Sequence, residues 1–344
     1  SEMCIRDSNG RPAAEGERFC RESTLVFADV DFERLEAARL SESSFNDSKS
    51  LFPAGNALHL ALPEQVPGAP GLEYAFNPAR PFLPSPSRCR ERCEEIISIQ
   101  TAGLAKRMEH TRAQRLVIGI SGGKDSSTVA ALAVAAYGRE NVLGVLMPDG
   151  VQPDIDYSQA LVQHLDLPHT TINIHDAVQG VLNEMEKAGL TPSRQTKVNL
   201  PSRVRMATLY AVAQSVEGGI VINTSNLSED WVGYCTIYGD SAGAFSPLGM
   251  YTTEEVVALG RQLGLPEKFL IKPPSDGLTG LTDEDNLGFP YRAVNEYVRR
   301  GVVDPAIKER IDALHRASRF KFQTLPVYHN GLPMALTDET DYYN

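Results

Sequence analysis

Residues 121–127, Ser-Gly-Gly-Lys-Asp-Ser-Ser, place three hydroxyl groups, two glycines and a carboxylate in one short segment. An apolar, strand-like sequence at residues 115–120 precedes it, and helix-forming sequence follows. The glycines let the backbone approach an anion closely, and a helix N-terminus presents free N–H groups with a partial positive charge. Asp125 by itself would repel a phosphate, so we interpret it as a ligand of Mg²⁺ bridging phosphate oxygens. The segment therefore predicts a phosphate-binding loop with one metal-binding carboxylate.

The lysine in this segment does not belong to a Walker phosphate loop. That motif needs a glycine five residues before Gly123 and a Ser or Thr after the lysine. The two positions hold Ile118 and Asp125 instead. Lys124 is then either a helper that adds positive charge near phosphates or a solvated surface lysine. The alternative for the whole segment is a tight strand-to-helix turn in which Asp125 is only an N-terminal helix charge.

Strand-like and helix-like sequences alternate after residue 87. The strand-like runs are residues 115–120, 141–148, 169–174 and 218–225, and helical patterns cover residues 87–111, 125–138, 154–167, 176–189 and 200–216. Apolar strands separated by helices predict an α/β fold, a Rossmann-like parallel sheet with helices on both faces. Ligands of such sheets bind beyond the carboxyl ends of the strands, where the polar segments after Ile120, Met147 and Asn223 fall.

The chain before residue 89 is irregular and differs from the rest. Residues 1–8 resemble translated adapter sequence, and we set them aside as a non-native artefact. Residues 9–45 hold a β-rich apolar run and a charged helical pattern, too little for a domain. Residues 46–88 include a stretch with seven prolines, which predicts a linker. We expect one domain at residues 89–330 and a C-terminal tail at 331–344.

Composition limits the classes of partner. The 344 residues include 33 Lys+Arg against 44 Asp+Glu, a net charge of −11, which disfavours nucleic acid as a partner. No apolar run is long enough to span a membrane, and no signal-peptide pattern opens the chain. Five cysteines without a CxxC pair favour a reduced, cytoplasmic protein. Cys89 and Cys93, four residues apart, leave half a zinc site as a minor alternative.

The loop at residues 121–127 resembles that of the ATP pyrophosphatases, proteins of the adenine nucleotide alpha hydrolase-like fold that cleave ATP between its α and β phosphates. Four further segments resemble NAD synthetases. They are LMPDGVQPDIDYSQA (residues 146–160), NLPSRVRMATLYAVA (199–213), INTSNLSEDWVGYCTIYGD (222–240) and KPPSDGLTGLTDEDNLGFPY (272–291). The resemblance spans roughly residues 90–325. It implies a homodimer that adenylates the nicotinate carboxylate of deamido-NAD⁺ with ATP and Mg²⁺ and then amidates it with ammonia.

The resemblance also implies roles for single residues. Asp125 and Glu229 would form the catalytic pair that holds Mg²⁺, the alternative for Glu229 being an N-terminal helix charge. The implied ATP-binding residues are Gly119, Ile120, Ser121, Gly122, Gly123, Lys124, Asp125, Ser126, Ser127, Thr224 and Ser275. The implied contacts to deamido-NAD⁺ are Arg203, Asp240 and Lys321, with a surface lysine as the rival for Lys321 and with Arg205 as a structural ion pair.

Four positions depart from the pattern of the NAD synthetases. Leu146 replaces an arginine, Ile237 and Thr253 each replace a lysine, and Ala244 replaces an aspartate. Three of the four changes remove a cationic side chain. We therefore expect the contacts to adenine and phosphate to be rearranged in this chain.

The nitrogen source divides the NAD synthetases into ammonia-dependent and glutamine-dependent forms. Residues 9–45 resemble the closing strand and tail of the nitrilase-like glutaminase domain, so the parent enzyme is expected to hydrolyse glutamine and this chain to use only ammonia. The alternative is an unrelated N-terminal extension. Rival functions are another ATP pyrophosphatase, such as a GMP synthetase or a tRNA-thiolating enzyme, and a nucleotide-binding regulatory protein without turnover.

Overall fold

The computed structural model describes residues 4–6, 12–15, 25–29, 36–37, 40, 88–152, 155–271 and 282–324. Two compact units, Ser1–Leu83 and Pro84–Asn344, make up the chain. The predicted tail at residues 331–344 and almost all of the predicted linker at 46–88 lie outside the described residues.

Among the described residues of the first unit, two strands form a small antiparallel pair. β1 (Cys4–Arg6) pairs with β2 (Pro12–Glu15), so a strand lies within residues 1–8, the segment interpreted as a non-native artefact. Residues 25–29, within the run interpreted as β-rich, have no regular secondary structure, and that expectation is wrong for these five residues. The apolar run is short, and a short run does not hold a strand conformation unless neighbouring strands pair with it.

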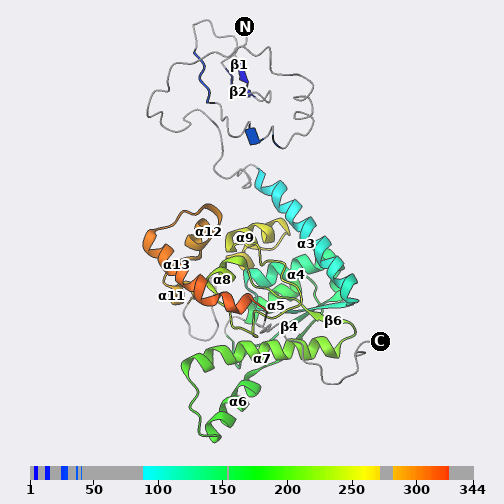
Figure 1. Ribbon diagram of the computed structural model, residues 1–344. Helices are drawn as coiled ribbons and strands as arrows, with labels where there is room; N and C mark the ends of the chain where they lie inside the picture. Colours follow the sequence, from blue (N-terminus) through cyan, green and yellow to red (C-terminus); the bar gives the residue numbers. More distant parts are fainter. Residues whose placement is uncertain are drawn as a thin grey trace, which may run out of the picture. The chain divides into compact units, whose positions relative to one another are not determined.

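The second unit is built on a four-stranded parallel sheet (Figure 1). Its strands are β3 (Arg115–Gly119), β4 (Val142–Leu146), β5 (His169–Thr171) and β6 (Gly219–Val221), in the order β5-β4-β3-β6. The predicted parallel α/β fold is confirmed, although β5 and β6 are shorter than their apolar runs. The chain leaves β3 toward β4 and later returns to the opposite side of β3. This reversal is the switch point at which open sheets of this kind bind ligands.

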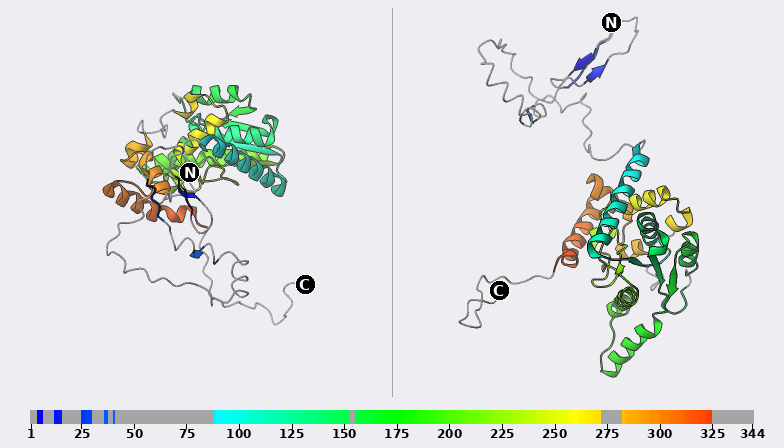
Figure 2. Two further views of the ribbon diagram at one scale, coloured as in Figure 1. Left: turned by 90° about the horizontal axis from the view of Figure 1, so that it is seen from above. Right: turned by 90° about the vertical axis from the view of Figure 1, so that its right-hand side faces the viewer.

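Helices cover both faces of the sheet, and the side chains of β3 are therefore buried on both sides. Leu116 and Ile118 pack in one apolar cluster and Val117 in another. The helices of the first cluster are α3 (Cys89–Thr111), α4 (Lys124–Tyr137), α5 (Ile155–His164), α9 (Thr253–Gln262) and α10 (Glu267–Leu270). Those of the second are α6 (His175–Lys187) and α7 (Arg194–Ser215). α7 begins six residues before the predicted helix and contains Pro201, and in Figures 1 and 2 the pair α6–α7 projects at one end of this unit.

A third apolar cluster supports the short helix α8 (Leu227–Val232). It joins α8 to α11 (Asp283–Leu287), α12 (Tyr291–Arg300) and α13 (Pro305–Ser318), and the 3-10 helix η3 (Arg319–Phe322) follows α13. A further 3-10 helix, η2 (Arg139–Asn141), links α4 to β4. None of the helices in the described part of the chain combines the length and the apolar composition that crossing a bilayer requires.

Candidate functional site

The glycine-rich loop leaves the sheet at the carboxyl end of β3 and is fixed against its neighbours. The Ile120 N–H donates to the Val145 carbonyl of β4 at 2.9 Å. Gly122 has φ +74°, and a Cβ placed there would lie 2.6 Å from the Ser158 nitrogen of α5. Only glycine satisfies both the positive φ and this close approach of two backbones. The glycine therefore sets the loop directly under α5.

Serine hydroxyls hold the loop in shape. Ser121 Oγ lies 3.0 Å from Ser126 Oγ, accepts from the Gly123 N–H at 3.3 Å, and so bridges the loop to the first turn of α4. Gly123 is the N-cap residue and supplies no side chain, so the first N–H groups of α4 are not capped from within the helix. This arrangement is suited to an anion.

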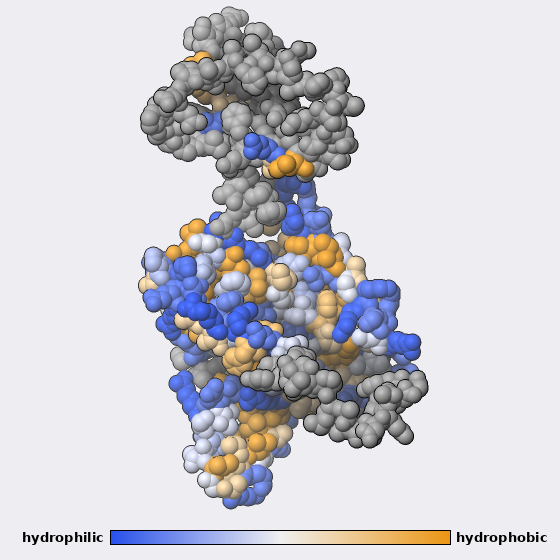
Figure 3. Space-filling model, viewed as in Figure 1, coloured by the Kyte–Doolittle hydropathy of each residue, from blue (hydrophilic) through white to orange (hydrophobic). Residues whose placement is uncertain are grey.

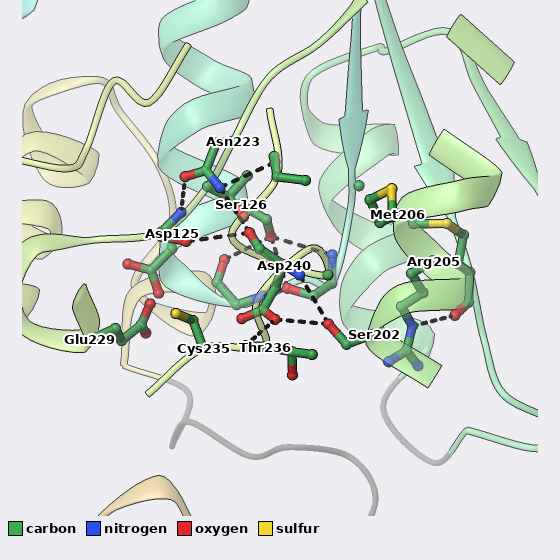
Figure 4. A pocket seen from close by; sticks show the side chains of 18 of the residues that line it. Asp125, Ser126, Ser202, Arg205, Met206, Asn223, Glu229, Cys235, Thr236 and Asp240 are labelled. Atoms are coloured by element: carbon green, nitrogen blue, oxygen red, sulfur yellow. Dashed lines mark hydrogen bonds between the residues drawn. The ribbon is translucent and has the colours of Figure 1, made fainter. Parts of the chain in front are cut away.

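The loop lines a cavity of about 680 Å³ beyond the carboxyl ends of the strands (Figure 4). Most of the predicted ATP-binding residues contribute to its wall: Gly119, Ile120, Ser121, Gly123, Lys124, Asp125, Ser126 and Thr224. Gly122 faces α5, and Ser127 is fully buried in α4 with no hydrogen-bond partner for its hydroxyl among the described residues. Ser275 lies outside the described residues.

Two carboxylates meet at one end of this cavity. Asp125 is in the first turn of α4 and Glu229 in the first turn of α8, and Figure 4 shows both near each other, with Arg205 and Met206 at the other end. Asn226 links them. Its Nδ2 donates to Asp125 Oδ1 at 2.9 Å, and its Oδ1 accepts from the N–H groups of Ser228 (2.9 Å) and Glu229 (3.1 Å). One buried amide thus joins the two helix N-termini that carry the carboxylates.

The charges at this end are unusual for a protein interior. Burial and the neighbouring Asp125 raise the pKa of Glu229 well above its ordinary value, with Lys124 opposing the shift. Lys124 is only 8% exposed, and its Nζ lies 3.2 Å from Asp125 Oδ2. Burial alone would lower the pKa of Lys124, but Asp125 and Glu229 outweigh it and the net shift is upward. The alternative of a solvated lysine is wrong, since Lys124 is buried in the cavity wall.

Asp283 and Tyr291 complete the surroundings of the carboxylate pair. Asp283, the first residue of α11, is 8% exposed, lines the cavity and acts electrostatically on both Lys124 and Glu229. The Tyr291 hydroxyl is buried without a hydrogen-bond partner in the described ranges, and burial together with Glu229 raises its pKa. Asn226 and Asp283 are not among the site residues predicted from the sequence. Both residues lie at a helix-start signal that could have identified them. Asn226 directly precedes Leu-Ser-Glu, and Asp283 directly follows Thr282 in Thr-Asp-Glu-Asp.

The chemistry of the donors fits a hard divalent cation. Asp125 and Glu229 offer carboxylate oxygens, the ligands that Mg²⁺ takes in proteins, and their mutual repulsion would be relieved by such an ion. Within the described ranges no three His, Cys, Asp or Glu side chains gather into a metal-binding group. A site of two protein carboxylates is what Mg²⁺ uses when phosphates and water supply its other ligands.

Arginines of α7 lie at the other end of the cavity. Arg205 lines the cavity and its Nε donates to the Met147 carbonyl at 3.1 Å. Arg203 is exposed, donates to the Ile237 carbonyl at 3.3 Å and does not contribute to the wall. Arg203 and Arg205 are two residues apart on one helix, so their side chains point to different faces. In this single chain, the face that meets the cavity is that of Arg205.

Asp240 and Lys321 both line the cavity and both have protein partners. Asp240 Oδ1 accepts from Ser202 Oγ and from the Thr236 N–H, each at 2.8 Å, which fixes the turn at residues 236–240. Lys321 Nζ donates to the carbonyls of Gly233 (2.9 Å) and Cys235 (2.7 Å), just beyond the C-terminus of α8. A solvated surface lysine does not describe Lys321, because its ammonium is held by two main-chain carbonyls at the cavity wall.

The four departures noted in the sequence have different surroundings. Thr253 is 7% exposed and joins a buried network in which Ser228 Oγ donates to Asn295 Oδ1 (2.6 Å) and receives the Thr253 N–H (3.1 Å). That network ties α8, and with it Glu229, to α9 and α12. Leu146 is buried at the end of β4, the Ala244 N–H donates to the Val221 carbonyl, and Ile237 accepts from Arg203.

Comparison with known proteins places this chain in a family. The model of a family described as NAD synthase matches residues 96–324. The NH(3)-dependent NAD(+) synthetase of Thermococcus kodakarensis is 38% identical over 213 residues, which are 61% of this chain and 82% of that protein.

Two solved structures are similar to this chain over nearly their whole length. The NMN synthetase of Francisella tularensis has a TM-score of 0.64 and 32% identity, covering 69% of this chain and 98% of its own. The NH3-dependent NAD synthetase of Campylobacter jejuni has a TM-score of 0.57 and 27% identity, covering 69% and 99%.

Proposed function

The chain belongs to the NAD synthase family, and we propose that it is a C–N ligase that converts deamido-NAD⁺ to NAD⁺. ATP adenylates the nicotinate carboxylate, and ammonia then displaces AMP, so that the products are NAD⁺, AMP and pyrophosphate. The observation that carries the proposal is the pairing of Asp125 with Glu229 through Asn226, beside a glycine-rich loop at the switch point of the sheet.

The residues of this chain position the reactants and need supply no nucleophile. The uncapped N–H groups at the start of α4 and the hydroxyls of Ser121 and Ser126 bind the phosphates of ATP. Asp125 and Glu229 would hold Mg²⁺, which supplies charge neutralisation to the departing pyrophosphate. Thr224 and Lys124 contribute polar and cationic contacts from the same wall. The cavity keeps the carboxylate of the substrate in line with the α-phosphorus and limits access of water.

Deamido-NAD⁺ is proposed to bind through Arg203, Asp240 and Lys321, as the resemblance implies. Arg205 is a further candidate because it lines the cavity at the end away from the carboxylates. A guanidinium at that position suits the phosphates of a dinucleotide. Ser275 stays a proposal for ATP and lies outside the described residues.

A second candidate acceptor is nicotinate mononucleotide. Of the two structures compared, the one named NMN synthetase is more similar to this chain than the NH3-dependent NAD synthetase, with TM-scores of 0.64 and 0.57. The chemistry would be the same, and the difference would lie in whether the cavity receives a mononucleotide or a dinucleotide.

Ammonia is the proposed nitrogen donor of this chain, and a glutamine-hydrolysing parent enzyme is proposed from residues 9–45. We further propose a homodimer formed through α6 and α7. Apolar side chains are exposed on this part, Val181 on α6, Tyr210 on α7 and Leu190 between the two helices, and Figure 3 shows apolar surface there. A cytoplasmic location is proposed from the small number of cysteines.

The test incubates the full chain with ATP, Mg²⁺ and ammonium. Deamido-NAD⁺, nicotinate mononucleotide, xanthylate or no acceptor is added, and AMP, pyrophosphate and the amidated product are measured. We expect AMP and NAD⁺ in equal amounts with deamido-NAD⁺, and loss of both in Asp125→Ala. Turnover with xanthylate alone would indicate a GMP synthetase-like enzyme, and binding of ATP without turnover would indicate a regulatory protein. Glutamine in place of ammonium is expected to give no NAD⁺.

A further inference from the structure

Lys124 is a buried cation at the start of a helix whose first turn carries one acidic residue, Asp125. It is the first residue of α4, next to the positive end of the helix dipole, and it is 8% exposed. A buried ammonium at the N-terminus of a helix is unfavourable unless nearby carboxylates compensate it. Asp125, the next residue, supplies one such carboxylate, and others come from elsewhere in the fold.

Three carboxylates from three helices provide that compensation. Asp125 Oδ2 of α4 lies 3.2 Å from Lys124 Nζ, and Glu229 of α8 and Asp283 of α11 act on the same ammonium. All four residues line one cavity. The ammonium therefore pairs directly with Asp125 of α4 and lies in the same cavity wall as the acidic first turns of α8 and α11.

The same oxygens are the ones that suit a divalent cation. Mg²⁺ held by Asp125 and Glu229 would lie near the ammonium of Lys124, and two cations a few ångströms apart repel each other in a protein interior. Phosphate oxygens entering with the metal would offer the ammonium a new partner of opposite charge. Lys124 would therefore contact carboxylates in the nucleotide-free site and phosphates in the nucleotide-bound site.

We propose that Lys124 is an internal counter-cation that holds Asp125, Glu229 and Asp283 together in the nucleotide-free protein and moves to the phosphates when magnesium nucleotide binds. Free Mg²⁺ then competes with Lys124 and binds weakly, whereas Mg²⁺ arriving with ATP displaces it. Lys124 is a positioning residue in the empty site and a phosphate contact in the filled one. The inference deepens the proposed function and rests on it, because it assumes that magnesium nucleotide binds in this cavity.

The experiment measures binding of Mn²⁺, as a paramagnetic substitute for Mg²⁺, to the full nucleotide-free chain by electron paramagnetic resonance. Lys124→Met removes the charge and keeps the length of the side chain, and Lys124→Arg keeps the charge. Lys187→Met is the matched control, because Lys187 also contacts a carboxylate (Glu184, 2.7 Å) but on an exposed helix surface. We expect Mn²⁺ to bind Lys124→Met about tenfold or more tightly than wild type, with Lys124→Arg and Lys187→Met unchanged.

A second measurement covers the case in which Lys124→Met is poorly folded. Thermal melts with and without Mn²⁺ are expected to show that Mn²⁺ restores the melting temperature of Lys124→Met but hardly changes that of wild type. Wild-type Mn²⁺ affinity in a folded Lys124→Met, or a variant that Mn²⁺ does not rescue, would overturn the inference. If wild type forms NAD⁺ but Lys124→Met binds Mn²⁺ no more tightly than wild type, this inference alone is refuted. If Lys124→Met binds Mn²⁺ more tightly but wild type forms no NAD⁺, only the proposed function is refuted.

Discussion

Asn226 and Asp125 are 101 residues apart in the chain, and the side-chain amide of Asn226 donates to Asp125 Oδ1 at 2.9 Å. The other atom of that amide, Oδ1, caps the N-terminus of α8 one turn before Glu229. A single side chain therefore sets the distance between the two carboxylates that the reaction is proposed to use. Asn226 is completely buried, so its position is fixed on all sides.

Asn226→Ser tests this link, because serine can still cap α8 but cannot reach Asp125 as the amide does. We expect the unfolding free energy to stay within about 1 kcal/mol of wild type and kcat for NAD⁺ formation to fall about tenfold or more. Asn226→Ala, the comparison, loses the cap as well and should cost about 1 kcal/mol more in urea unfolding. A serine variant with wild-type kcat would show that the amide does not position Asp125.

Gly122 and Gly123 form a matched pair of loop positions. Gly122→Ala should lower the unfolding free energy by about 2 kcal/mol or more, because it combines a positive φ with a Cβ 2.6 Å from the backbone of α5. Gly123 has φ −82° and its nearest neighbour for a new Cβ is 3.5 Å away, so Gly123→Ala should cost less than about 1 kcal/mol. Thermal melts of the two variants decide the matter, and equal losses would contradict the observed loop geometry.

Asp230 should give the protein a specific dependence on pH. Burial raises its pKa from 3.8 to about 6, although Arg319 opposes the shift. Because the folded pKa exceeds the unfolded one, wild type should lose stability relative to Asp230→Asn as pH rises from about 4 to about 6, and the difference should be constant above that. Urea unfolding of both proteins across pH 4 to 7.5 measures it. A difference that is flat between pH 4 and 6 would exclude the raised pKa.

Cys235 should be unreactive although it lies in the cavity wall. Burial raises the pKa of its thiol to about 12, Asp240 adds to the shift, and Lys321 opposes it. Since the thiolate is the reactive form, iodoacetamide at pH 8 should modify Cys235 about a thousandfold more slowly than an unburied thiol. Peptide mapping by mass spectrometry reads this out, with the exposed Cys89 as the internal control. Comparable labelling of both residues would contradict the prediction.

The two arginines of α7 can be separated by kinetics. If Arg203 contacts deamido-NAD⁺ as proposed, Arg203→Met should raise KM for deamido-NAD⁺ about tenfold and leave KM for ATP unchanged. Arg205→Met serves as the comparison, since Arg205 lines the cavity and Arg203 does not. An increase of KM in Arg205→Met alone would move the substrate contact from Arg203 to Arg205.

The class of fold and the place of the loop can be predicted from the amino-acid sequence without the structure. Apolar runs at residues 115–120 and 141–148, separated by a helical pattern, are local signals that predict a parallel sheet covered on both faces. The glycines and Asp125 mark the turn after the first of these strands, because backbone freedom and charge are properties of single residues. These features depend on short stretches of chain and could be predicted from them.

Tertiary structure alone decided which side chains meet at the carboxyl end of the sheet. The amide of Asn226 on Asp125, the place of Asp283 in the same cavity wall as Lys124, the burial of Lys124 and the presence of Arg205 instead of Arg203 at that wall all join elements distant in sequence. Their geometry follows from how α8 and α11 pack on the third apolar cluster, and from how α7 is rotated on the sheet. Periodicity fixes which face of a helix is apolar, but long-range packing sets its rotation and depth, and those decide which charges share a site.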